Sequence, residues 1–368
     1  MIPRTSPCKP IIYDETNLAD PYWQNPLIPA IFYRLTSYKN GRNGAIAERV
    51  GAVEFHNFKT ADNKLAGIEV SLSEDVVDGY AKIVDALVIG KTANADAETL
   101  AASPHGIITP RTENFTIDGA HFYNYDFMSA AALGDCSHCF HSAATDSGAR
   151  TYTTSRLEFT NVPRKIKYQY PERGIFHDMD GSLTGLGPNT YATKGYKHNQ
   201  QPECTLDTTL FDGVICDDSV QIRRVAFTGY KPDHFRGQEM NIYPYDKATI
   251  EVLSEADKQT FIDDHSNRSE IIWKEKLKPM KGWAVPYVTG HRYRLTWAND
   301  LDFTRMDIEI SDRWATGDNE VLFVLPFVDA REAINVTRKD SGDFMNTQIE
   351  DKTLLNTKSS WTSGFNWL

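Results

Sequence analysis

The sequence predicts an all-β protein, a right-handed parallel β-helix followed by a smaller antiparallel β-sandwich-like domain. The first observation is a short strand-like phrase that returns at nearly constant intervals. The apolar centres of the phrase are Phe55, Ile89, Phe122, Phe159 and Phe227. The first three steps between them are 34, 33 and 37 residues, and the last step of 68 residues is close to twice that spacing. The second observation is that each phrase is apolar at alternate positions and stops at Asn or Gly. Strands at a fixed period predict stacked coils, because a single coil cannot bury its own apolar face.

Each repeat carries two strands with turns at both ends, which fits a coil better than a ladder of hairpins. Residues 115–122 alternate inward Phe and Ile with outward Thr and Asp, and Gly119 supplies a turn. Further short strands begin at glycines that lie about half a repeat before the repeated phrase. These glycines are Gly106, Gly174 and Gly213. Residues 76–89 favour a strand because of their β-branched content, and residues 98–102 predict one short helical turn.

The chain divides into three parts by its composition and by its pattern of apolar residues. Residues 1–45 are rich in Pro, Asn and Tyr and predict an extended lead-in, residues 46–245 carry the β-helix, and residues 246–368 form a C-terminal β-rich domain. In this last part, period-two alternation predicts antiparallel strands with one solvent-exposed face, and a continuous apolar run predicts a buried strand. These segments are 293–297, 306–310 and 321–327.

The charge of the chain limits its partners. The formal net charge is -11 over 368 residues and no Lys/Arg cluster is present, which argues against nucleic acid and against an anionic membrane surface. No apolar run is long enough to span a bilayer. The long, ridged wall of a β-helix suits extended polymers, so the expected partners are extracellular glycans or other surface proteins.

Three sequons point to an extracellular or cell-surface setting. N-glycan acceptors occur at Asn114, Asn267 and Asn335. The expected origin is a piece of a longer secreted or membrane-anchored protein. The alternative is a cytosolic protein with chance sequons.

The five cysteines divide into two interpretable pairs and Cys8. Cys204 and Cys216 are twelve residues apart, and a disulfide closing such a loop contributes about 3 kcal/mol in the chain-entropy model. Cys136 and Cys139, with histidines close by, could bind zinc, but no second cluster supplies the remaining ligands. A vicinal or cross-loop disulfide is therefore favoured for this second pair.

A Gly-rich turn holds the sharpest chemical motif. His177, Asp178 and Asp180 lie within four residues, and the two carboxylates are expected to point the same way. They could hold Ca²⁺ together with Ser182 or Thr184, or split into a general acid and a general base. The alternative is a polar β-turn in which the Asp side chains accept hydrogen bonds from backbone N–H groups.

A few basic residues are candidates for binding glycan on the outer wall. They are Arg111, Arg150, Lys197, His198, Arg223 and Arg224. Lys197-His198 and Arg223-Arg224 could form a locally basic strip, and the alternative for all six is ordinary solvated charge. The acidic charge of the whole chain argues against tight binding of acidic glycans unless such a strip receives them.

Several long segments resemble the fibrocystin and fibrocystin-L family. They are residues 107–116, 136–139, 145–150, 176–185, 201–204, 216–227 and 278–286. The resemblance implies a portion of a very large cell-surface protein with parallel β-helix repeats, anchored elsewhere by one membrane helix and linked to cilia. A more distant resemblance, to the cell-migration-inducing hyaluronidase group, implies hyaluronan binding or cleavage. The fibrocystins offer no catalytic residues to carry over.

Three functions follow as hypotheses. The first is a non-enzymatic extracellular β-helix module for adhesion, surface-coat assembly or glycan binding. The second is a polysaccharide hydrolase or lyase that uses Asp178 and Asp180 with His177 assisting. The third is a structural rod that binds no ligand. No cofactor other than calcium is expected.

Overall fold

The computed structural model describes twelve stretches of the chain. They are residues 29–72, 79–110, 114–135, 150–168, 174–229, 239–244, 269–272, 282–291, 293–297, 306–311, 334–337 and 346–349. The chain forms two compact units, residues 1–311 and 312–368. Strands dominate the described residues of both units, and the helices among those residues are the short α1 (Ala97–Ala101) and the 3-10 turn η1 (Lys197–Asn199). The predicted all-β class and the short helical turn are confirmed.

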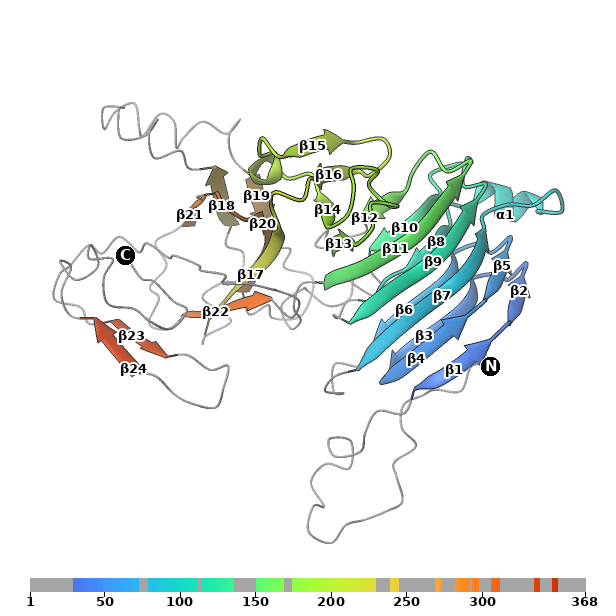
Figure 1. Cartoon of the computed structure of the whole chain (residues 1–368), viewed down its shortest axis with the longest axis horizontal. Coiled ribbons are helices and arrows are strands. Elements are labelled where there is room, and N and C mark those ends of the chain that lie inside the picture. Colours follow the sequence, from blue (N-terminus) through green and yellow to red (C-terminus); the bar gives the residue numbers. More distant parts are fainter. Residues whose placement is uncertain are drawn as a thin grey trace, which may run out of the picture. The chain divides into compact units, whose positions relative to one another are not determined.

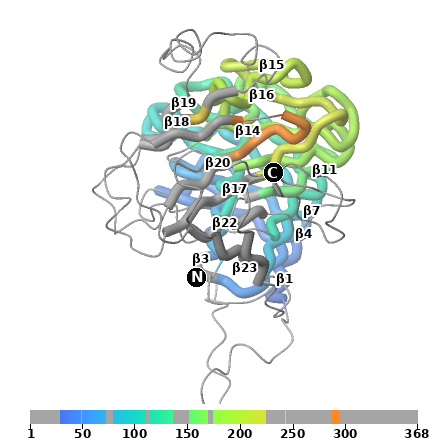
Figure 2. The backbone as a smooth tube through the Cα atoms, turned by 90° about the vertical axis from the view of Figure 1, so that its left-hand side faces the viewer, coloured from blue at the N-terminus to red at the C-terminus, as the bar shows by residue number. Residues whose placement is uncertain are grey.

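The first unit contains two parallel sheets between which the chain alternates (Figure 1). One sheet begins with β1 (Ala30–Tyr33), β4 (Ala52–His56), β7 (Tyr80–Ile89), β9 (Phe115–Tyr123) and β11 (Arg150–Thr160). The short strands β2 (Thr36–Tyr38) and β5 (Lys59–Ala61) extend its early rungs, and β7 pairs with β5. The other sheet runs β3 (Asn43–Val50), β6 (Ala66–Leu72), β8 (His105–Ile108), β10 (Ala131–Asp135) and β12 (Ile166–Tyr168). Figure 2 shows β1, β4, β7 and β11 following one another in this order.

The rungs of the first sheet bend at residues with left-handed backbone, at a first position in five rungs and also at a second position in four of them. At the first bend, φ lies between 51° and 85°, at Arg34, Asn57, Asp85, Gly119 and Arg156. At the second bend, five residues later, φ lies between 54° and 56°, at Lys39, Asp62, Asn124 and Asn161. The left-handed backbone favours Gly, Asn and Asp, which occupy six of these nine positions, including the ends of the repeated phrases at Asn57, Asn124 and Asn161. The predicted turn at Gly119 is confirmed.

The parallel register corrects the predicted column of apolar centres. Phe55 is opposite Ile83, only 28 residues later, whereas Ile89 is opposite Tyr123 on the outer face. Phe122 is opposite Val88 on one side and Phe159 on the other. The prediction mixed three columns. Phe55 and Phe122 precede different bends although each is followed by one spacer and Asn, and Ile89 lies one residue out of step with Phe122.

Phe227 does not belong to the parallel sheets at all. It lies in β17 (Ile222–Gly229), which pairs antiparallel with β20 (Gly282–Val288) and β22 (Met306–Ser311). The predicted boundary at residue 245 therefore runs between partners of one sheet, because β17 precedes it and both neighbours follow it.

The core is built from columns of like side chains. Phe32 stacks on Phe55 with ring centroids 5.5 Å apart, and Phe122 stacks on Phe159 at 5.4 Å. Phe55 and Phe122 have no exposed surface. Parallel in-register pairing produces these stacks, because the same position of successive rungs faces the same interior.

The parallel stack ends at antiparallel strands. β13 (Gly174–Asp178) is the last parallel partner of β11, and β14 (Thr190–Lys194), β16 (Gly213–Cys216) and β15 (Cys204–Asp207) then follow antiparallel. Cys204 and Cys216 are directly opposite each other in β15 and β16, and they form the predicted disulfide.

The remaining described strands are also antiparallel. β18 (Glu239–Pro244) pairs with β19 (Ser269–Ile272) and with β21 (Tyr293–Trp297), which confirms the predicted strand at 293–297. In the second unit, β23 (Ile334–Thr337) pairs with β24 (Asn346–Ile349). The predicted strand at 321–327 lies outside the described residues, and sandwich packing stays a prediction.

Candidate functional site

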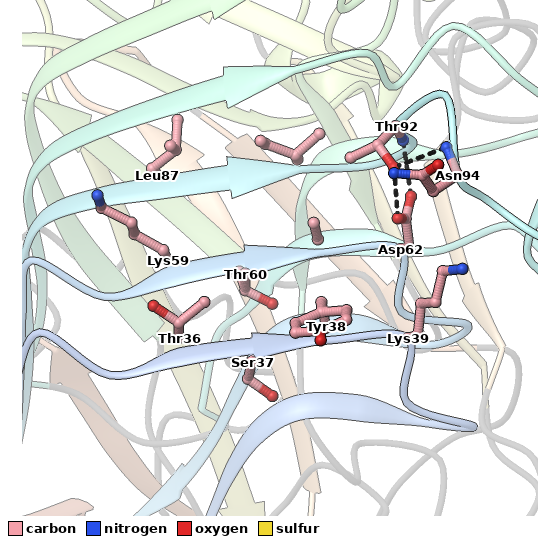
Figure 3. Close-up of a pocket in the computed structure, with 12 residues that line it drawn as sticks. Thr36, Ser37, Tyr38, Lys39, Lys59, Thr60, Asp62, Leu87, Thr92 and Asn94 are labelled. Carbon is pink, nitrogen blue, oxygen red and sulfur yellow. Dashed lines mark hydrogen bonds between the residues drawn. The ribbon is translucent and has the colours of Figure 1, made fainter.

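An open groove lies on the outer face of the first rungs. Its volume is about 360 Å³. The lining includes Tyr38 from the end of β2, Lys39 at the bend that follows it, Lys59 and Ala61 from β5, and Ile89 from β7. Figure 3 shows Lys59 and Lys39 at opposite ends of the groove with the Tyr38 ring between them. The groove therefore combines an aromatic surface with two cations.

The period-two alternation of three neighbouring strands builds the floor of the groove. Tyr38 is opposite Ala61, and Ala61 is opposite Ile89, so these three side chains share the outward direction. The buried Thr60 and Val88 precede Ala61 and Ile89 and face inward. Tyr38 is 65% exposed, which leaves its ring available to a ligand.

One wall of the groove is held in place by a buried carboxylate. Asp62 Oδ1 accepts a hydrogen bond from the backbone N–H of Thr92 at 2.6 Å, and Oδ2 accepts one from Thr92 Oγ1 at 2.6 Å. The backbone N–H of Asn94 donates to Thr92 Oγ1 at 3.1 Å. Because both oxygens of Asp62 are engaged, this carboxylate serves to fix the loop that carries Thr92 and Asn94.

The same outer face continues over β9 and β11. The His121 ring lies against that of Tyr123 with centroids 3.8 Å apart and planes tilted by 30°, and its Nδ1 lies 3.0 Å from a carboxylate oxygen of Glu158. His121 Nε2 lies 3.2 Å from Thr160 Oγ1. Tyr123 follows Tyr38, Ala61 and Ile89 in the register, so the face offers a second aromatic group further along the stack.

The Asp178–Asp180 turn caps the end of the parallel stack. Asp180 Oδ2 accepts a hydrogen bond from the backbone N–H of Arg156 at 2.7 Å, and its Oδ1 accepts from Ser182 Oγ at 2.6 Å. Ser182 Oγ in turn accepts from the backbone N–H of Leu157 at 2.9 Å. These side chains stand where the next parallel strand would have paired with the second half of β11.

Asp178 has a different environment from Asp180. It has no exposed surface, and its Oδ2 accepts hydrogen bonds from the backbone N–H of Leu183 at 3.0 Å, from that of Thr184 at 2.7 Å, and from Thr184 Oγ1 at 2.9 Å. Asp178 Oδ1 has no hydrogen-bond partner among the described residues. The predicted hydrogen bonding of backbone N–H groups by these Asp side chains is present for both residues.

The pKa values of the two carboxyls shift in opposite directions. Burial raises the pKa of Asp178 above its ordinary value, although the hydrogen bonds from Thr184 and Leu183 oppose the shift. Burial also acts to raise the pKa of Asp180, but the bonds from Ser182 and from the Arg156 backbone outweigh it and lower that pKa. His177 stacks on Tyr191 at 4.5 Å, and burial lowers the pKa of its imidazole.

The predicted basic residues do not gather on one described surface. His198 is fully buried. Its ring lies between tyrosine rings, and its Nε2 lies 2.9 Å from the carbonyl oxygen of Pro286. Its side chain is therefore not accessible to a glycan. Lys197 is exposed, and Arg223 is half-buried with its guanidinium donating to Gln221 Oε1. Arg150 and Arg224 are described only in their backbone, within β11 and β17, and Arg111 lies outside the described residues.

The other predicted modification sites are only partly described. Asn114 has φ 63°, and its side-chain nitrogen donates to the Gly79 carbonyl at 3.0 Å. Asn335 lies in β23, and its side chain is not described. Asn267, Cys136 and Cys139 lie outside the described residues. Glycosylation and the second disulfide stay predictions.

Metal-binding clusters and membrane-spanning helices are both absent from the described residues. No group of three or more His, Cys, Asp or Glu side chains is placed there to hold a metal ion. Within those same stretches, no helix is long and apolar enough to cross a membrane.

Sequence reasoning missed the groove. Tyr38 and Lys39 fall in the segment predicted as an extended lead-in, because β2 and β5 are only three residues long and show too little alternation to reveal a strand. No sequence pattern marks the two segments as partners, because the left-handed backbone that follows each of them, at Lys39 and Asp62, is seen only in the structure.

Comparison with known proteins confirms the expected resemblance at a distant level. No family model matches the chain. Fibrocystin-L of Homo sapiens is 27% identical over 268 residues, which cover 69% of this chain and 6% of that protein. Fibrocystin-L of Mus musculus is 26% identical over 269 residues, and fibrocystin of Canis lupus familiaris is 27% identical over 165 residues. The similarity thus concerns a small part of each much longer relative.

Proposed function

We propose that this chain, similar to a short region of the fibrocystins, is a non-enzymatic module of a large cell-surface protein. Its two parallel sheets form a right-handed β-helix, and the outer face of the early rungs binds glycan in adhesion or surface-coat assembly. The similarity to fibrocystin-L and the Cys204–Cys216 disulfide support the extracellular setting, because disulfides persist in oxidising compartments.

The Tyr38 groove is the observation that carries glycan binding. A sugar ring has an apolar C–H face and a rim of hydroxyl groups, so it packs on an exposed aromatic ring while polar side chains accept and donate at its edges. Tyr38, Ala61 and Ile89 supply the apolar floor, and Thr36, Asn94 and the two lysines supply polar edges. The groove is open, as an extended polymer requires.

Replacing Tyr38 with Ala should remove most glycan binding. The loss of a stacking surface in a polar groove is expected to weaken affinity about tenfold or more, because aromatic contacts contribute roughly 0.5–1.5 kcal/mol beyond their buried area. Oligosaccharides immobilised on an array, followed by calorimetry, measure the effect. Tyr33→Ala is the matched control, since Tyr33 is also 62% exposed but lies before the first bend. Equal binding by wild type and Tyr38→Ala would contradict the groove as the site.

A carbohydrate-active enzyme is the second candidate, and the opposite pKa shifts of Asp178 and Asp180 favour it. The burial of Asp178 weighs against it, because an acid must touch its substrate. The retained oligosaccharides from the binding experiment are therefore examined for cleavage. If the oligosaccharides are cleaved and the variants Asp178→Asn and Asp180→Asn abolish this cleavage, the protein is an enzyme. If the oligosaccharides are neither retained nor cleaved, the structural rod is the remaining function.

Calcium at the Asp178–Asp180 turn is a further part of this proposal. The buried Asp178 Oδ1 has no partner among the described residues, and the Asp180 carboxylate is near enough to act on Asp178 electrostatically. A bound cation would stabilise the folded state by mass action. If calcium binds, Tm rises with millimolar Ca²⁺ and the rise disappears in Asp180→Asn; an unchanged Tm in wild type contradicts a calcium site.

A further inference from the structure

We infer that the ligand of the Tyr38 groove is an acidic glycan, one that carries carboxylate or sulfate groups. This inference rests on the proposed glycan binding and specifies its chemical class. It differs from the expectation that basic residues elsewhere, such as Arg223 and Arg224, would receive an acidic polymer.

Two lysines supply the positive charge of the groove. Lys39 and Lys59 are both exposed, and neither forms an ion pair with any described residue. By contrast, Lys64, Lys91 and Lys194 each lie against a carboxylate: Glu98, Asp126 and Asp212 respectively. The two groove lysines are therefore left for a ligand, whereas the other three lysines are paired with carboxylates within the fold.

Among the described residues, no acidic group around the groove forms an ion pair with these cations. Asp62, the acid in the lining, is buried and its two oxygens are engaged by Thr92. Asp96 lies close enough to Lys39 for its pKa to be lowered by that charge, and its carboxylate accepts the backbone N–H of Thr99 as the N-cap of α1 instead of pairing with Lys39. Glu98 is held by Lys64.

The spacing of the two cations suits a polymer with regularly placed anions. Lys59 is opposite Thr36, and Lys39 follows Thr36 by three residues, so the two lysines are about 10 Å apart along the strand direction, at about 3.3 Å per residue. The Tyr38 ring lies between them (Figure 3). A sugar stacked on Tyr38 therefore presents acidic substituents of its own ring or of its neighbours to the two ammonium groups.

The net charge of the chain opposes the binding of an acidic polymer, so the positions of the two groove lysines are important for binding. With a formal charge of -11, the protein repels an acidic polymer at long range. Binding then depends on a short-range site where cations and a stacking ring coincide. Both the attraction and the repulsion are screened by salt, but the contact pairs in the groove are screened least.

The test compares matched acidic and neutral oligosaccharides on the full chain. The probes are chondroitin sulfate hexasaccharide and chitin hexasaccharide, measured by calorimetry at 50 and 300 mM NaCl. We expect the acidic probe to bind at least tenfold more tightly, and the double variant Lys39→Gln/Lys59→Gln to lose that preference while retaining weak binding of the neutral probe. Lys91→Gln/Lys194→Gln is the control with the same change of charge, and its preference should match that of wild type.

The outcomes separate this inference from the proposed function. Equal affinity of wild type for both probes, or an unchanged preference in Lys39→Gln/Lys59→Gln, overturns the acidic class and leaves glycan binding in place. Loss of preference in the control pair as well assigns the effect to overall charge and overturns the groove. Failure of wild type to bind either probe overturns the proposed function itself. Circular dichroism of each variant verifies that it is folded.

Discussion

Replacing Phe122 with Ala is expected to lower the free energy of unfolding by about 3–5 kcal/mol. Phe122 has no exposed surface, stacks on Phe159 and meets the ring of Tyr125 edge-on at 6.5 Å. Truncation removes the transfer energy of the ring and leaves a cavity between two rungs. Parallel in-register strands fix the spacing of the rungs, so the neighbours can close that cavity only in part.

Urea denaturation followed by circular dichroism measures this loss. Leu206→Ala is the control, because Leu206 is a large apolar residue that is 46% exposed, and its truncation should change the free energy by less than about 0.5 kcal/mol. A Phe122→Ala variant as stable as the control would show that the column of aromatic side chains does not form.

Acidification from pH 6.5 to 4.5 is expected to destabilise the protein by several kcal/mol. His105 and His198 are both buried, and burial lowers the pKa of each from its ordinary 6.5 to about 4. In the unfolded chain each titrates near pH 6.5, so each histidine takes up a proton when the chain unfolds in this window. Stability supplied by the neutral histidines is fully present above pH 6.5 and is lost as the pH falls towards 4.

The expected slope is about 1.4 kcal/mol per pH unit for each histidine, or about 2.7 for the two together. Free energies of unfolding measured by urea at four pH values give this slope. The variant His198→Gln should lose about half of it, and His105→Gln/His198→Gln nearly all of it. A slope that is the same in wild type and in the double variant would contradict the assignment. Carboxyl groups of lowered pKa, such as that of Glu54, contribute mainly below this window.

Much of the local structure could be read from the residues themselves. The alternation in residues 115–122 and the turn at Gly119 are both present in β9. The short spacing of Cys204 and Cys216 predicted their disulfide, and the Asp-Gly-Ser segment predicted a turn in which carboxylates accept backbone hydrogen bonds. These features are local, because each depends on residues within about a dozen positions.

The register and the site depended on contacts that no local pattern specifies. The phrases at Phe55 and Phe122 look alike, yet they precede different bends, and only the pairing of whole strands separates them. His198 looks like a surface charge beside Lys197, but the packing of η1 on β20 buries it. Two three-residue strands bring Tyr38, Lys39 and Lys59 into one groove.

The sequence by itself thus determined that the chain forms short alternating strands, where many of them turn, and which two cysteines pair. Only the tertiary structure decided which strands are neighbours, which histidines are buried and where cations meet an exposed aromatic ring. The physical reason is that alternation decides the face of a side chain within one strand, whereas the neighbours across the sheet come from rungs some thirty residues away. Their alignment is set by packing of the whole core.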